Sequence, residues 1–235
     1  MLLVLALSGL AGAVAAEPAA GVAQLNEDAD FLYSESFLAA HPDQYFRLRG
    51  AQARAGGDLA AARRYFRRAA RHADKLSQAA YAEMLWNGEG GEPDRALAYA
   101  WMDLAAERAT PVLLARREHY WAALTAQERE RAVRDGQAVY AEYADDVAKP
   151  RLERELRRAR KAVTGSHLGW NGTLDVQVRT AGGGFARIEG ERYWRDRHWQ
   201  PEAYWAFQDR ILAGPRLRGS VEVGPIDALE GADTP

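Results

Sequence analysis

The first half of the sequence repeats itself at a spacing of 36 residues, and this repeat limits the chain to a small set of helical folds. The matched pairs are Asp58 with Asp94, Ala60 with Ala96, Ala62 with Ala98, Tyr65 with Trp101, Ala69 and Ala70 with Ala105 and Ala106, and Ala73 with Ala109. Small residues in this register allow two helices to pack closely, and the aromatic residue fills the space between adjacent hairpins. The repeat therefore predicts stacked helical hairpins, each burying its apolar face against its neighbours.

Each matched helix follows a turn rich in glycine that ends in aspartate. The first turn is Gly56-Gly57-Asp58, and the second extends over residues 88–94 with the sequence GEGGEPD. Glycine ends a helix in the left-handed conformation, and aspartate caps the N-terminus of the next helix. The preceding segments, 42–55 and 76–87, are the partner helices. The pattern predicts two antiparallel helix pairs.

The second copy contains a Gly-x-Gly turn, then an aspartate, a spaced alanine, an aromatic residue and an Ala-Ala pair. These residues are Gly88, Gly90, Asp94, Ala98, Trp101, Ala105 and Ala106. The stretch 80–108, AYAEMLWNGEGGEPDRALAYAWMDLAAER, thereby resembles a Sel-one-like repeat, a relative of the tetratricopeptide repeat. The first copy, with Asp58, Ala62, Tyr65, Ala69 and Ala70, has a shorter turn and resembles a generic tetratricopeptide-like hairpin. The resemblance implies an interaction scaffold without chemistry of its own.

Two hairpins are marginal alone, because about three such units are usually needed to bury a continuous core. Downstream, residues 111–124 are expected to form a helix, and Thr125 and Glu128 form a capping box that opens a helix towards Val147. This pair is expected to close the stack, which we place at residues 42–147. Upstream, residues 17–41 are expected to cap the other end through Phe31, Leu32, Phe37 and Leu38.

The segment 148–164 is predicted to be a basic helix that begins at Pro150 and links the stack to the C-terminal part. Its apolar stripe consists of Leu152, Leu156, Ala159 and Val163, and its other faces are rich in arginine. The arginines could bind an anionic ligand. We favour a solvated face whose arginines pair with Glu153, Glu155 and the acidic N-terminal segment, because charge runs are usually solvated.

Residues 165–225 have the pattern of a small α+β unit, and residues 226–235 that of a disordered tail. Strands are expected at 173–179, 185–191 and 219–223, with a hairpin turn at 182–184 and a helix at 201–212. The predicted fold is therefore mainly α, a tetratricopeptide-like stack of antiparallel helix hairpins (an α-solenoid) with a small α+β C-terminal unit.

Aromatic and arginine residues alternate in this C-terminal unit. A ligand-binding platform there would use Trp194, Arg195, Arg197, Trp199 and Tyr204, which could stack sugar rings or hold a peptide. Aromatic residues at such spacing more often fill a core. We therefore favour the interpretation that these residues attach a small sheet to its helix.

The first sixteen residues match a secretory signal peptide. An uncharged apolar run from Leu2 to Val14 precedes small residues and the polar Glu17, where the mature chain is expected to begin. No later stretch is apolar for long enough to span a membrane, and the chain has no cysteine, which suits an oxidising compartment. These features predict a periplasmic protein without a transmembrane anchor in its mature form.

No arrangement of residues indicates catalysis. The five histidines are scattered, and His198 with Glu202 lacks a third metal ligand. Ser166-His167 lacks the context of a nucleophile elbow. The net charge of -2 gives no general attraction to nucleic acid. We therefore predict no catalytic residue, metal or cofactor, and no nucleic-acid partner.

The sequence as a whole predicts a non-enzymatic scaffold for protein–protein interaction in a Gram-negative periplasm. Its partner would be another envelope protein. Binding of peptidoglycan or another glycan through the C-terminal Trp/Arg segment is the alternative. An envelope hydrolase is the third and least favoured possibility, because no acid, base and nucleophile can be named together.

Overall fold

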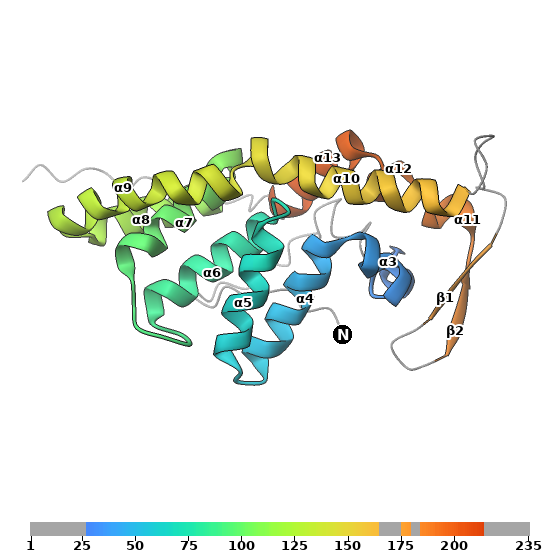
Figure 1. The fold of residues 1–235 in the computed structure, drawn as a ribbon, viewed down its shortest axis with the longest axis horizontal. Helices are drawn as coiled ribbons and strands as arrows, with labels where there is room; N and C mark the ends of the chain where they lie inside the picture. Colours follow the sequence, from blue (N-terminus) through green and yellow to red (C-terminus); the bar gives the residue numbers. More distant parts are fainter. Residues whose placement is uncertain (1–26, 165–174, 180–183, 214–235) are drawn as a thin grey trace, which may run out of the picture.

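The computed structural model describes residues 27–164, 175–179 and 184–213, which form a mainly helical protein with one small sheet (Figure 1). The elements are α2 (Ala29–Leu32), α3 (Glu35–Ala40), α4 (Pro42–Ala55), α5 (Leu59–Ala70), α6 (Lys75–Asn87), α7 (Arg95–Ala105), the 3-10 turn η1 (Ala106–Arg108), α8 (Pro111–Ala123), α9 (Ala126–Tyr143), α10 (Asp145–Thr164), β1 (Val176–Arg179), β2 (Phe185–Ile188), α11 (Gly190–Tyr193), α12 (Asp196–Trp199) and α13 (Pro201–Ala213). The predicted signal peptide, third strand and C-terminal tail lie outside the described residues.

Helices α4 and α5 form one hairpin and α6 and α7 form the next, as the repeat predicts. The side chain of Asp58 accepts a hydrogen bond from the backbone N–H of Ala61 (2.9 Å), and Asp94 accepts one from Leu97 (3.0 Å). Gly88 ends α6 in the left-handed conformation. Both aspartates therefore cap their helices as expected.

Most of the matched alanines are buried where the hairpins meet, but Ala60 is exposed whereas its match Ala96 is buried. Ala62, Ala69, Ala98 and Ala105 have no exposed surface, so no longer side chain could replace them without moving a helix. The two hairpins also share a backbone feature. The matched residues Ala73 (φ 59°) and Ala109 (φ 54°), which follow α5 and α7, are both in the left-handed conformation.

The turn of the second hairpin lies directly on the first hairpin. A Cβ atom added at Gly90 would lie 2.8 Å from the carbonyl carbon of Leu59, which is closer than a side chain can approach. The left-handed φ of 80° at Gly90 also favours glycine. The longer second turn is therefore part of the contact between the hairpins.

The prediction that both matched aromatic residues fill the space between helices is correct for Trp101 but not for Tyr65. Trp101 is 3% exposed and lies against Tyr81 and Tyr143, but Tyr65 is half-buried. The fully buried aromatic of the first hairpin is the next residue, Phe66, whose ring occupies the space that a side chain at Gly50 would need. Tyr65 is more exposed because, among the described residues, no helix covers the outer face of α4 and α5.

Helices α9 and α10 follow one another as a long rod across the hairpins (Figure 1). The predicted capping box of Thr125 and Glu128 opens α9. The predicted break before Pro150 is wrong, because α9 ends one residue before Ala144 and Pro150 lies inside α10. Asp145 begins α10, where its carboxylate is held by Lys75 and Arg108 and favours a helix N-terminus.

The N-terminal helices pack mainly with the C-terminal part of the chain. Strands β1 and β2 pair antiparallel, with Val176 opposite Ile188. The buried members of this second core are Phe31, Leu32, Phe37, Ala40, Val178, Ile188, Tyr193 and Trp199. The segment that was expected to cap the first hairpin thus contributes its aromatic residues to a core with the β-hairpin, α11 and α12.

Candidate interaction site

A solvent-open hollow lies between α7, α8 and α9, at one end of the rod, and encloses about 660 Å³ of space, part of it open solvent. We call it the α7–α9 groove. It is lined by Tyr99, Ala100, Asp103, Trp121, Ala132, Val133, Gly136, Gln137 and Tyr140. Most of this lining is apolar or aromatic, which is typical of a surface that binds another molecule.

The groove exists because α9 crosses close to α7. A Cβ atom at Gly136 would lie 3.6 Å from the Cβ of Ala100, so both contact positions are small. The rings of Tyr99 and Trp121 lie 4.8 Å apart in one wall. Val133 is 60% exposed, although it is an apolar residue on a charged helix. The groove therefore offers an uncovered apolar surface beside an aromatic wall.

Three polar residues of the lining, Asp103, Gln137 and Tyr140, give the groove directional contacts. The hydroxyl of Tyr140 donates to Asp103 Oδ2 (3.0 Å), and Arg117 lies 3.4 Å from Asp103 Oδ1. Burial raises the pKa of Tyr140, and the charge of Asp103 raises it further. Tyr140 therefore remains neutral and donates its hydrogen bond to Asp103, which leaves its oxygen free to accept, and Gln137 adds an amide. These groups can hydrogen-bond a partner, but they do not form a nucleophile–base pair.

The residues of the predicted C-terminal platform are brought together, but most of them face inward. Trp199 is 2% exposed and Tyr204 has no exposed surface. Trp194 is half-buried, with its ring 4.3 Å from that of Trp199. The arginines at 195 and 197 pair with acidic residues of the N-terminal segment. Only Trp194 and Arg195 retain appreciable exposed surface.

Asp28 is the acidic centre of this pairing and is fully buried. Its carboxylate accepts hydrogen bonds from His198 (2.8 Å), Arg197 and Arg192 (3.3 Å). Burial alone would raise the pKa of Asp28, but the bonds from His198 and Arg197 outweigh it and lower the pKa to about 2. The acidic segment thus pairs with the C-terminal arginines, whereas Arg157 and Arg158 of α10 pair with Glu153 and Glu155 as expected.

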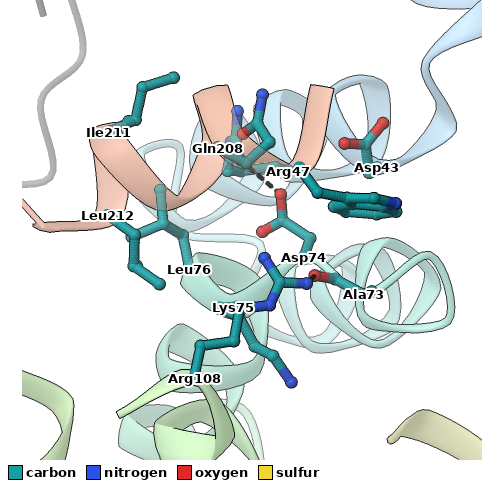
Figure 2. Close-up of a pocket in the computed structure, with 11 residues that line it drawn as sticks. Asp43, Arg47, Ala73, Asp74, Lys75, Leu76, Arg108, Gln208, Ile211 and Leu212 are labelled. Carbon is teal, nitrogen blue, oxygen red and sulfur yellow. Dashed lines mark hydrogen bonds and ion pairs between the residues drawn. The ribbon is translucent and has the colours of Figure 1, made fainter. Parts of the chain in front are cut away.

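A second, smaller pocket of about 300 Å³ of empty space lies where the hairpins meet α13 (Figure 2). Figure 2 shows Asp74 beside Arg47, with Lys75 and Arg108 below and residues of α13 above. Lys75 is 3% exposed and pairs with Glu107 (2.6 Å) and Asp145 (3.0 Å). Arg108 pairs with Asp145 (2.7 Å) and with Asp209 of α13 (3.1 Å). These ion pairs join the stack to α10 and α13.

Asp43 borders this pocket and makes the stability of the protein depend on pH. Burial raises its pKa to about 7, and the charge of Asp74 contributes, although a hydrogen bond from Tyr204 opposes the rise. The folded state therefore holds a proton that the unfolded state releases above its ordinary pKa of 3.8. The contribution of Asp43 to stability falls as the pH rises from about 4 to about 7.

We expect the Asp43→Asn variant to lack this loss of stability. Urea unfolding of both proteins at pH 5 and pH 7.5 measures the effect. The free energy of unfolding should fall between the two pH values by more in the unchanged protein than in the variant, since other titrating groups are common to both. An equal change with pH in the two proteins would contradict the protonated state of Asp43.

Sequence analysis singled out none of the residues that make the α7–α9 groove a surface. The available signal was Val133, an apolar residue within the charged run 127–135, QERERAVRD. The groove itself depends on the crossing of α7 and α9, and the order of apolar and charged residues along α9 does not specify that crossing.

In the part of the chain that the structure describes, no group of three or more histidine, aspartate or glutamate residues is placed to hold a metal ion. None of the described helices has the combined length and hydropathy of a membrane-spanning segment. Comparisons with family models, with curated proteins and with solved structures found no match for this chain.

Proposed function

We propose that this protein is a non-enzymatic scaffold of the bacterial periplasm that binds another envelope protein in the α7–α9 groove. The observation that carries the proposal is the exposed apolar floor at Val133 beside the Tyr99–Trp121 wall. The 36-residue repeat supports a Sel-one-like, tetratricopeptide-like type of stack. Repeats of that type present surfaces to partners, which is the role that the groove would serve.

The lining favours one kind of partner, a short amphipathic helix. Grooves between helices commonly bind the apolar face of such a helix. Val133 would contact its apolar side chains, while Gln137 and the Asp103 carboxylate would accept hydrogen bonds from its polar edge. A partner with a basic residue beside its apolar face fits best, because Asp103 is only partly neutralised by Arg117.

Glycan binding by the C-terminal Trp/Arg segment has weaker support. Sugar rings bind to the exposed faces of aromatic side chains, and Trp199 and Tyr204 are both buried. Arg197, which could have contacted an anionic sugar, is bound to Asp28.

The proposal is tested by affinity capture from a periplasmic extract with the mature chain and two valine variants. Val133→Asp places a charge on the groove floor, whereas Val112→Asp makes the same change at an exposed valine of α8 (47% exposed) outside the groove. We expect a discrete partner to bind the unchanged chain and Val112→Asp equally, and Val133→Asp at least tenfold less. No partner above background, or equal loss in both variants, would contradict the proposal.

A further inference from the structure

The outer face of the first hairpin carries uncovered aromatic and arginine side chains. We call it the α4–α5 face, and it consists of Tyr45, Phe46, Arg49, Arg64, Tyr65 and Arg68. Tyr45 is 39% exposed, and Phe46 and Tyr65 are half-buried. Arg49 lies 5.6 Å from the ring centre of Tyr65, and Arg68 lies 4.1 Å from that of Phe46. The guanidinium groups are thus held against aromatic rings at the surface.

The second hairpin has a cover at the position that matches this face. Trp101, which matches Tyr65, is 3% exposed because it lies against Tyr81 and the end of α9 at Tyr143. The first hairpin has no such cover among the described residues. The N-terminal segment does not supply it, since Phe31 and Phe37 are buried against the β-hairpin, α11 and α12 instead.

The charge of the α4–α5 face favours an acidic occupant. No carboxylate of the described residues forms an ion pair with Arg49, Arg64 or Arg68. Just after α5, its C-cap residue Arg71 pairs with Glu142 (3.0 Å). A second copy using the same face would oppose arginines with arginines, which is unfavourable.

The chain itself contains a segment of matching chemistry. Residues 219–235, GSVEVGPIDALEGADTP, hold four carboxylates and no lysine or arginine. The apolar residues of this segment are Val221, Val223, Ile226 and Leu229. Acidic and apolar side chains in one segment suit a face on which arginines lie over aromatic rings.

The segment is also within reach. Helix α13 ends at Ala213, and the preceding Leu212 lines a pocket together with Arg47 of α4 and Ala73, which follows α5. Residues 214–218 alone can span about 17 Å at about 3.4 Å per residue, which is close to the length of α5.

We propose that residues 219–235 bind to the α4–α5 face of their own chain through ion pairs with Arg49, Arg64 and Arg68 and apolar contacts with Tyr45 and Tyr65. This surface is separate from the α7–α9 groove, so the inference does not depend on the proposed function. Bound there, the segment would complete the stack at its open end.

The full chain has no cysteine, so pairs of introduced cysteines test the proposal directly. One cysteine replaces Ala228, and the other replaces either Tyr45 or, as the matched control, Val112 on α8. Under mild oxidation we expect the 45–228 disulfide to form within one chain at least tenfold faster than the 112–228 disulfide. Adding salt should slow only the first reaction, since exposed ion pairs are screened.

Charge reversal identifies the ion pairs. Arg49→Glu with Arg68→Glu should reduce the rate of disulfide formation between positions 45 and 228 to that of the control pair. Adding Glu222→Arg with Glu230→Arg should restore the rate. Reversal of Arg134 on α9, which is highly exposed, should have no effect. Equal rates for the two cysteine pairs, an unchanged rate after reversal, or disulfides formed between chains would overturn the proposal.

Discussion

Replacing Asp28 with alanine is expected to lower the free energy of unfolding by about 3–5 kcal/mol, because it leaves two partly buried arginines and the buried His198 without their shared carboxylate. Asp28 is fully buried and joins Arg192, Arg197 and His198 to the N-terminal segment. Equilibrium unfolding in urea measures the change. Loss of the carboxylate should also release the N-terminal helices from the second core, so hydrogen exchange in residues 29–40 should accelerate.

The matched control is Asp30→Ala, two residues away. The Asp30 side chain is 43% exposed and pairs with Arg192 at the surface, where an ion pair contributes at most about 1 kcal/mol. A loss at Asp28 no larger than the loss at Asp30 would show that the buried carboxylate does not hold the two ends of the chain together.

Trp101→Ala is expected to cost about 3–5 kcal/mol of stability, since it removes a large side chain from a closed core. Its ring lies 4.8 Å from Tyr81 and 4.5 Å from Tyr143, so its loss would affect α6, α7 and α9 together. Urea unfolding again provides the measurement.

The repeat offers its own control for this change. Tyr65 occupies the matched position in the first hairpin, but it is half-buried, and Tyr65→Ala should cost about 1 kcal/mol. An equal loss of stability in the two variants would contradict the claim that Trp101 is covered by neighbouring helices and Tyr65 is not.

Local features of the sequence predicted much of the fold. Asp58, Asp94 and Thr125 cap their helices because each is a short acceptor side chain before an apolar run, which is a local property. The buried alanines follow from the period in the same way. The helix start predicted at Pro150 is wrong, because Lys75 and Arg108, which are distant in sequence, hold Asp145 and thereby set the helix boundary there.

The candidate sites depended on contacts that no local pattern contains. Trp199 and Tyr204 had the types expected of a platform, but packing against the N-terminal segment and α4 buries them. The α7–α9 groove requires α9 to cross α7 at Gly136 and Ala100, and a single glycine in a helix does not specify its partner. The acidic and basic segments were both visible, but it is the C-terminal arginines that pair with Asp28 and Asp30, while Arg157 and Arg158 of α10 pair within their own helix.

Site-specific photocrosslinking in the periplasm tests the scaffold role most directly. A benzophenone amino acid at position 133 lies on the groove floor, and the same group at position 112 is the control on α8. We predict one discrete adduct with an envelope protein from position 133 and none from position 112. The absence of an adduct at 133, or the same adducts from both positions, would contradict the central claim that the α7–α9 groove binds a partner.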